Sequence, residues 1–351
     1  METVVSILVS VVVLGILVFV HELGHYAVGR FFKFSIVEFS LGMGPKILKK
    51  EKNGILYSIR AFPIGGMCQF YGEDEGATTE KSFNSHNVWQ RIAVIVAGPL
   101  MNILFAIILA IISLTAYGDV KAIALPHPII AEAPEANGAA YKAGLIVKDE
   151  IIAINGAEIT TSEELITAVR SVTGDSLTMT VVREGQTMDF TVNGIYDASL
   201  GYNRIGTSIS DATTERISYS FFEACGQAFT YIGDVFSEMI KFFGMLFSGQ
   251  VASGDVMGPV GTVSIIGQAV RLGFEVVLRI AILLSINLGI FNILPFPALD
   301  GGRLAFLLFE AVFKKRLPPE KEGLVHLIGL VILFGLIIFI TFNDIMRIIN
   351  G

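Results

Sequence analysis

Charged residues are scarce in this chain of 351 residues, where they make up 16% against 53% hydrophobic residues. Soluble domains carry about a quarter charged residues. The composition therefore excludes an ordinary soluble protein and indicates one embedded in a lipid bilayer. The formal net charge of -7 comes without a basic patch, so nucleic acid is not expected as a partner.

Cysteine and histidine are also rare. The two cysteines, Cys68 and Cys225, have no zinc-binding spacing, and the topology predicted below places them on opposite sides of the membrane, which excludes a disulfide. Only 5 histidines occur, yet two of them belong to the motif His21-Glu22-Leu23-Gly24-His25. An accidental HExxH is expected in roughly one such chain in a hundred or fewer.

Long hydrophobic runs are what the chain has in place of charge. Four of them are long enough to cross a bilayer, and they cover residues 4–31, 88–117, 274–294 and 323–349. The first is too long for a cleavable signal peptide, and no Lys or Arg precedes it. The sequence thus predicts a multi-pass α-helical membrane protein with about four transmembrane helices.

Basic residues in the loops predict the orientation of these spans. They gather in the first and third loops, as Arg30, Lys33, Lys46, Lys49, Lys50, Lys52, Arg60 and Lys81, and as Arg303, Lys314, Lys315, Arg316 and Lys321. Such loops face the cytoplasm in most membrane proteins. We therefore expect the N-terminus and the region between the second and third spans to lie outside.

The HExxH motif stands in the cytoplasmic half of the first span. On a helix, His21 and His25 share one face and Glu22 lies beside them, an arrangement that predicts a zinc site with Glu22 as the general base. The alternative is that these polar residues only pair with one another in a helix bundle. Because ionisable groups are costly in hydrocarbon and are usually functional there, zinc binding is favoured.

A catalytic zinc site needs a third protein ligand, and Asp300 is the candidate. Pro295 and Pro297 should prevent regular helix just before it, and Gly301 and Gly302 should permit a sharp turn after it. Asp-Gly-Gly alone is usually just a turn. In the predicted topology, however, Asp300 falls at a depth similar to that of His21.

A substrate within the membrane must unwind locally, because helical carbonyls are hydrogen-bonded and shielded. Asn287 and Asn292 could bind the freed backbone groups, and Asn102 is a weaker candidate. The alternative is that these amides only bridge helices.

Three regions outside the spans are also informative. Residues 34–41 and 55–62 are rich in strand-forming residues, and they form either a plain hairpin or an edge strand that pairs with substrate. The middle region is expected to be soluble, with strands at 150–154, 176–182 and 188–192 and a helix at 162–172 capped by Ser162. Residues 214–247 are expected to form a helix on the membrane surface or against the core, or alternatively a fifth span.

These motifs together resemble the site-2 protease family of intramembrane zinc metalloproteases, in the bacterial regulator-of-sigma-E protease type with one PDZ-like domain. The resemblance covers most of the chain. It is carried by HELGH at 21–25, Pro63-Ile64-Gly65-Gly66, Trp89-Gln90-Arg91-Ile92, residues 97–102, Met257-Gly258-Pro259-Val260-Gly261 and residues 292–302.

The resemblance implies Zn²⁺ bound by His21, His25 and Asp300, Glu22 as catalytic base, and substrate contacts of Asn287 and Asn292. It also implies regulated proteolysis, in which a single-span membrane protein of the anti-sigma-factor or signal-peptide-remnant type is cut after an upstream site-1 protease has trimmed it. The expected location is the bacterial inner (plasma) membrane.

The predicted fold is therefore a helical membrane protein with a membrane-associated β-hairpin region and an inserted PDZ-like α/β domain. Its expected parts are the first helix (1–33), the hairpin region (34–87), the second helix (88–117), the PDZ-like domain (118–196), an interfacial segment (197–273), the third helix with its Leu-Asp-Gly motif (274–303), a cytoplasmic loop (304–322) and the fourth helix (323–351).

Two other functions compete with this one. The first is a quality-control zinc peptidase whose site faces the cytosol and cuts loops rather than spans. The second is a membrane scaffold or chaperone that holds partners through the PDZ-like domain and has an inert metal site. The intact Glu22 and the full ligand set favour an enzyme over the scaffold.

Overall fold

The structure is a computed structural model, and it describes residues 2–73, 79, 81–136, 138–172, 176–193, 195–197, 202–250 and 257–350. The chain divides into two compact units. The first combines Met1–Tyr117 with Tyr219–Gly351, and the second is Gly118–Ser218. Each unit is described by itself.

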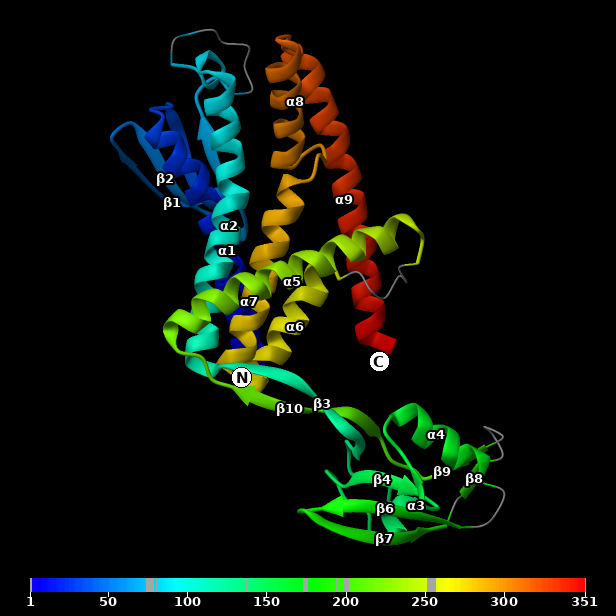
Figure 1. The fold of residues 1–351 in the computed structure, drawn as a ribbon. Coiled ribbons are helices and arrows are strands. Elements are labelled where there is room, and N and C mark those ends of the chain that lie inside the picture. The colour runs from blue at the N-terminus through cyan, green and yellow to red at the C-terminus, as the bar shows by residue number, and fades with distance from the viewer. Residues whose placement is uncertain are drawn as a thin grey trace. The chain divides into compact units, whose positions relative to one another are not determined.

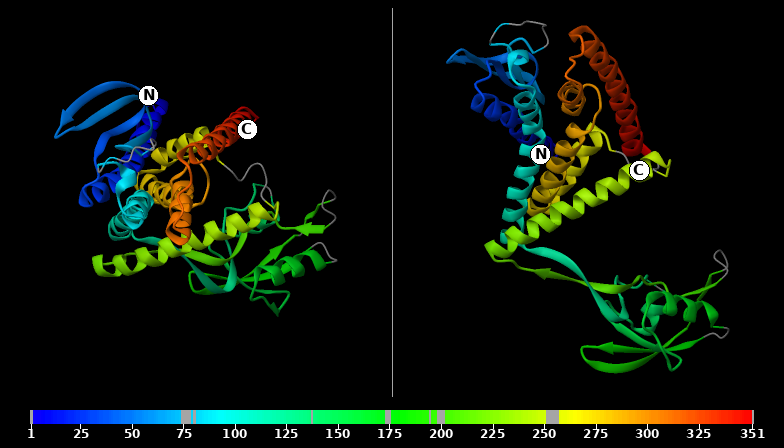
Figure 2. Two further views of the ribbon diagram at one scale, coloured as in Figure 1. Left: turned by 90° about the horizontal axis from the view of Figure 1, so that it is seen from above. Right: turned by 45° about the horizontal axis from the view of Figure 1, so that its top comes forward.

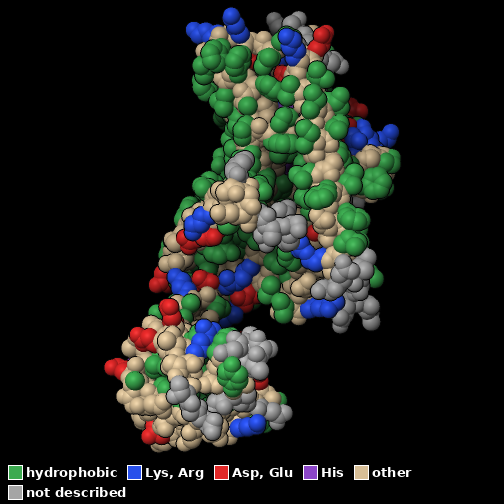
Figure 3. All heavy atoms as spheres, turned by 90° about the vertical axis from the view of Figure 1, so that its right-hand side faces the viewer, with side chains coloured by type: hydrophobic (Ala, Val, Ile, Leu, Met, Phe, Trp, Pro, Cys, Tyr) green, Lys and Arg blue, Asp and Glu red, His purple; other side chains and the backbone are tan. Residues whose placement is uncertain are grey.

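Helices dominate the first unit (Figure 1). Among the described residues, four are long and apolar enough to cross a membrane, as predicted: α1 (Glu2–Phe31), α2 (Val88–Tyr117), α7 (Phe274–Ile293) and α9 (Pro319–Asn350). The structure also has α5 (Phe221–Phe247), α6 (Pro259–Leu272), α8 (Asp300–Phe313) and the short η1 (Phe83–Ser85). Hydrophobic side chains cover most of the helical surface seen in Figure 3, as expected for helices that face lipid.

Helix α2 packs against both α1 and α7 (Figure 2). Gly24 of α1 allows this, because a Cβ atom there would lie 2.2 Å from the carbonyl oxygen of Ala97 on α2. Gly289 of α7 also lies close to α2, with the carbonyl oxygen of Pro99 at 2.9 Å from its would-be Cβ. Small residues thus bring the backbones of three apolar helices together, as in other membrane bundles.

The hairpin predicted in the first loop is present and longer than expected. Strands β1 (Ile36–Lys52) and β2 (Ile55–Phe70) pair antiparallel through a turn at Asn53 and Gly54, where both φ angles are positive at 54° and 75°. Such angles are typical of the tight turns that join two strands. The hairpin packs into a hydrophobic cluster with α2, η1 and α8, formed by Phe34, Ile36, Ile55, Phe70, Phe83, Val94, Ile95 and Leu307.

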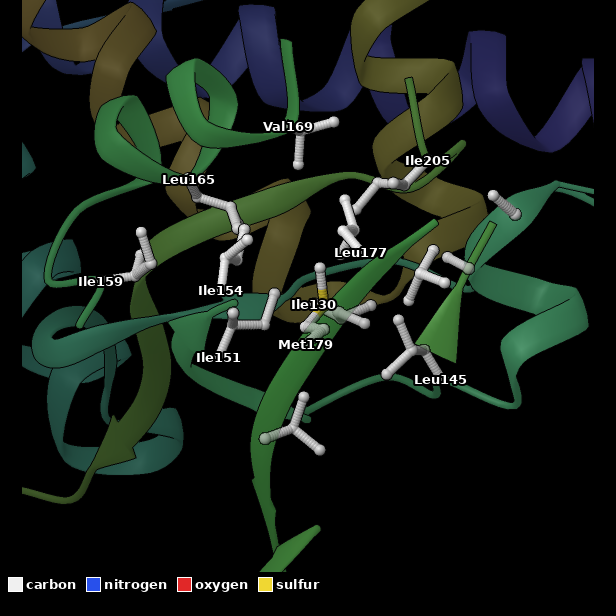
Figure 4. Close-up of a cluster of buried hydrophobic side chains, with 14 residues drawn as sticks. Ile130, Leu145, Ile151, Ile154, Ile159, Leu165, Val169, Leu177, Met179 and Ile205 are labelled. Carbon is white, nitrogen blue, oxygen red and sulfur yellow. The ribbon is translucent and has the colours of Figure 1, made fainter. Parts of the chain in front are cut away.

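The second unit is a small α/β domain. Its elements are β3 (Asp119–Ile130), α3 (Ala139–Ala143), β4 (Glu150–Ile154), β5 (Ala157–Glu158), α4 (Ser162–Ser171), β6 (Leu177–Arg183), β7 (Gln186–Val192), β8 (Ile195–Asp197), β9 (Tyr202–Arg204) and β10 (Ile209–Ile217). The main sheet has the strand order β10-β3-β4-β6-β7, and β5 pairs with β4. Helix α4 packs its Leu165 and Val169 into the core with Ile130, Ile154 and Met179 (Figure 4).

Several predicted boundaries differ from the structure. Strand β10 comes from the segment predicted to be interfacial, yet it pairs with β3 from Asp119 to Ile130, so the second unit extends to Ser218 rather than 196. The helix predicted over 214–247 accordingly begins at Phe221 and not at 214. Ser220 and Glu223 form a capping box there.

Three further features differ from the prediction. Helix α4 is capped by Thr161 and not by Ser162, because the Thr161 side chain accepts the backbone N–H of Glu164. The predicted interfacial segment also contains α6, at whose start the N–H groups of Gly258 and Gly261 donate to the buried Asp344 of α9 at 3.0 and 2.7 Å. The predicted loop 304–322 is largely α8, an amphipathic helix that contacts α2.

Candidate metal centre

Three side chains from two distant parts of the sequence converge within the first unit. The Nε2 atoms of His21 and His25 lie 3.2 Å apart. Oδ2 of Asp300 lies 3.0 Å from the first and 3.3 Å from the second. Among the described residues, this is the only group of three or more His, Cys, Asp or Glu side chains whose ligand atoms all lie within 4.8 Å of one another.

The spacing of these three ligand atoms fits a tetrahedral zinc ion. With zinc–nitrogen and zinc–oxygen bonds of 2.0–2.1 Å, neighbouring ligand atoms in a tetrahedron are about 3.3 Å apart. The three separations of 3.0, 3.2 and 3.3 Å agree with that spacing. Two imidazoles and one carboxylate leave the fourth position for water or substrate, as in catalytic zinc sites.

The orientation of His25 is fixed by helix α2. Its Nδ1 lies 2.8 Å from the carbonyl oxygen of Val94, and a carbonyl can only accept, so Nδ1 carries the proton. The neutral ring then presents the lone pair of Nε2 to the centre. A backbone carbonyl on the far nitrogen is a usual outer partner of a zinc-binding histidine.

Asn102 gives His21 the matching support. Nδ2 of its side-chain amide lies 3.1 Å from Nδ1 of His21, and the residue is fully buried. Its Oδ1 accepts no hydrogen bond from the described residues. A half-turn of the amide group would bring Oδ1 to Nδ1 of His21, which would then donate and leave the lone pair of Nε2 facing the centre. The structure therefore places Asn102 behind a proposed metal ligand, and its contact with substrate stays a prediction.

Gly98 makes room for His25. A Cβ atom on it would lie 2.2 Å from Nε2 and 2.5 Å from Cε1 of that ring. In the sequence alone, Gly98 is only a helix-disturbing glycine before Pro99, with no visible connection to the motif. Close approach of α1 and α2 is therefore a condition for the histidine's position.

Glu22 lies half-buried beside the three candidate ligands, against strand β2. A Cβ atom on Gly66 would lie 2.6 Å from Cγ of Glu22, and the backbone N–H of Cys68 donates to its carboxylate. The strand thus holds the carboxylate against α1. This contact was not predicted, although the Gly65-Gly66 pair is a conspicuous feature of the sequence.

Asp300 is presented by a turn between α7 and α8, residues 294–299. The two prolines keep this stretch out of regular helix, as expected, but Gly301 and Gly302 do not form a sharp turn. They belong to the first turn of α8, where a Cβ on Gly301 would lie 1.9 Å from the carbonyl oxygen of Leu294. Their role is close backbone approach rather than a reversal of the chain.

The two asparagines of α7 differ in availability. Asn292 donates through Nδ2 to the carbonyl of Leu288 at 2.8 Å, one turn back in the same helix. The Oδ1 atom of Asn287 is buried and accepts no hydrogen bond from the described residues. Asn287 therefore has unused hydrogen-bonding capacity, whereas one amide hydrogen of Asn292 is already engaged.

Comparisons with known proteins agree with this chemistry. The model of peptidase family M50 matches residues 9–336. A Fusobacterium nucleatum protein named "Putative zinc metalloprotease" is 32% identical over 346 residues, which cover 98% of this chain and 100% of the relative. An Agrobacterium fabrum protein of the same designation is 31% identical over 97% of this chain and 95% of its own length. The zinc metalloprotease RasP of Geobacillus kaustophilus is 29% identical, over 99% of both chains.

Proposed function

This chain belongs to peptidase family M50, the site-2 protease family of zinc metallopeptidases, and we propose that it cleaves its substrates within the bilayer. In this proposal His21, His25 and Asp300 hold the zinc ion and Glu22 is the general base. The quality-control alternative differs in placing the cut bond outside the hydrocarbon layer.

The position of the HExxH motif along α1 is the observation that carries the proposal. Helix α1 has 30 residues, whereas about 20 suffice to cross the hydrocarbon layer. His21 lies ten residues before Phe31, the end of the helix, which is about 15 Å along its axis. Mostly apolar residues flank the motif on both sides in sequence. A peptide bond that reaches the site must therefore leave the aqueous phase or already lie in the membrane.

The roles of the side chains follow from their placement. When bound, zinc acts as a Lewis acid that polarises the substrate carbonyl and acidifies the attacking water. Glu22, held by the N–H of Cys68, is placed to take the water's proton and return it to the leaving nitrogen. Asn287, with its unused carbonyl oxygen, is the better of the α7 amides for binding an unwound substrate backbone.

The substrates we propose are single-span membrane proteins of the anti-sigma-factor or signal-peptide-remnant type, trimmed beforehand by a site-1 protease. The chain would lie in the inner membrane with its N-terminus outside.

The second unit, proposed to be PDZ-like, would exclude untrimmed ectodomains. The unit begins with β3 and ends with β10, and these strands pair Asp119 with Ile217. Because its two ends are therefore adjacent, residues 118–218 can be replaced by a short glycine-serine linker. That deletion should release cleavage of untrimmed substrates, and unchanged selectivity would contradict the size-filter role.

Quantitative membrane proteomics tests the proposed function. Cells would express wild type, Glu22→Gln or, as a matched control, Glu51→Gln at an exposed hairpin position, at rest and under envelope stress. Trimmed single-span proteins should accumulate only with Glu22→Gln. If no such fragment accumulates while soluble or loop-cleaved products change, the site cuts outside the membrane and the proposal fails.

A further inference from the structure

The turn that carries Asp300 contains a residue in an unfavourable backbone conformation. Ala298 has φ of 77°, in the left-handed region that residues other than glycine rarely adopt. Such a conformation is unfavourable for a residue with a side chain and persists only where the surroundings impose it. Because Ala298 is two residues before Asp300, whatever imposes this conformation also sets the position of the carboxylate.

Besides backbone hydrogen bonds within the turn, such as Leu299 N–H to the carbonyl of Phe296, helix α9 provides two contacts to it. Nδ1 of His326 lies 3.0 Å from the backbone nitrogen of Ala298. An amide N–H can only donate, so Nδ1 accepts, and the neutral ring carries its proton on Nε2. One turn further along α9, a Cβ atom on Gly329 would lie 2.3 Å from Cβ of Pro297. Gly329 thus lets α9 approach the turn, and His326 forms the hydrogen bond.

The ring of His326 is itself held in place by α8. It meets the ring of Phe306 edge to face, with the ring centres 5.6 Å apart and the planes at 73°. His326 and Asp300 also line the same hollow, together with Leu327. The imidazole is therefore fixed between the turn and the helix that Asp300 begins.

We propose that His326 is a positioning residue for the third metal ligand. Its hydrogen bond to Ala298 keeps the turn in the conformation that places Oδ2 of Asp300 3.0 and 3.3 Å from the two histidine nitrogens. This inference rests on the proposed role of Asp300 as a zinc ligand. It assigns to α9 a part in the metal centre, although α9 supplies none of the proposed ligands.

Two substitutions of nearly equal shape separate the hydrogen bond from packing. His326→Asn retains an acceptor oxygen near the place of Nδ1, whereas His326→Leu has the same branching and no acceptor. Leu327→Ala serves as the control, since it removes an apolar side chain from the same hollow. Asp300→Ala tests the proposed ligand itself. All four are made in the full-length protein, purified in detergent.

The readout is the zinc dissociation constant, measured by competition with a chromogenic chelator, together with the visible spectrum of the Co²⁺-substituted protein. We expect His326→Leu to bind zinc about tenfold more weakly and to show an altered Co²⁺ spectrum, as is usual when a group that orients a metal ligand is removed. His326→Asn and Leu327→Ala should resemble wild type.

The outcomes distinguish this inference from the proposed metal site. If Asp300→Ala weakens zinc binding strongly but His326→Leu binds as wild type does, the positioning role of His326 is wrong and the site stands. The positioning role is also wrong if His326→Asn and His326→Leu are equally impaired, since packing would then account for both. If Asp300→Ala binds zinc as wild type does, the proposed ligand set itself is wrong.

Discussion

Gly98 lies directly against the imidazole of His25, so that a Cβ atom added to it would be 2.2 Å from Nε2. The substitution Gly98→Ala must therefore displace the ring or separate α1 from α2. We expect zinc affinity to fall by roughly 100-fold, at the upper end of the range for changes that disturb a ligand's orientation. Chelator competition on the purified protein measures this.

Gly15→Ala is the control for that experiment. Gly15 lies in α1, and a Cβ atom there would meet nothing within 4 Å among the described residues. The same chemical change should therefore leave zinc binding and activity as in wild type. Equal zinc affinities for Gly98→Ala and Gly15→Ala would show that the close approach of α2 to His25 has no part in metal binding.

Gly66→Ala should separate turnover from metal binding. Its Cβ atom would lie 2.6 Å from Cγ of Glu22, and none of the three candidate ligands is among its nearest neighbours. We expect kcat to fall about 100-fold, as when a general base is misplaced, while the zinc dissociation constant stays unchanged. Loss of zinc along with activity would mean that β2 supports the whole motif and not only Glu22.

Asn102 is predicted to orient His21 through its buried amide. Replacing it with leucine, of similar shape but without the amide, should weaken zinc binding about 10- to 100-fold. Asn292→Leu is the matched control, because the amide of Asn292 bonds within its own helix. An Asn102→Leu protein with wild-type zinc affinity and unaltered thermal unfolding would remove Asn102 from the centre.

Glu38 should make the hairpin sensitive to acid. Burial by itself would raise the pKa of Glu38, but hydrogen bonds from Lys46, Ser58 and Arg60 hold the pKa below its usual value. A carboxyl group whose folded pKa is lowered stabilises the fold above its unfolded pKa, and this contribution is lost as pH falls through the folded value. Limited proteolysis of the hairpin should therefore speed up as pH is lowered through the acidic range.

Glu38→Gln tests the origin of that pH dependence. Glutamine keeps the shape but cannot ionise, so the variant should be cut more readily at neutral pH, and its cleavage should change less with pH. If wild type and Glu38→Gln show the same pH profile, another group is responsible.

The features that could be predicted from the sequence are those that depend on local spacing. The i, i+4 pair His21 and His25 needs only one helix, and the four long apolar runs need only their own length. The closeness of Asp300 to the two histidines could be predicted because Pro295 and Pro297 mark the end of a span at a similar depth. The strand pairing of 209–217 with 119–130 could not be predicted, since it joins segments far apart in the chain and takes up the start of an expected helix.

The supporting contacts could not be predicted for the same physical reason. Gly98 against His25, Gly66 against Glu22 and His326 on Ala298 each join residues from separate elements. A glycine has no side chain whose chemistry indicates its partner, and a single histidine in a span has many possible roles. Only the packing of α2, β2 and α9 around α1 and α8 shows which neighbour each of them serves.

X-ray absorption at the zinc edge of the purified full-length protein is the decisive measurement for the metal centre. We predict one zinc ion per chain, with nitrogen and oxygen ligands at about 2.0–2.1 Å, the signature of two imidazoles and no sulfur. In Asp300→Ala the set of coordinating atoms should change and the zinc content should fall. Sulfur at about 2.3 Å, or an unchanged spectrum in both His21→Ala and Asp300→Ala, would mean that these side chains do not bind the metal.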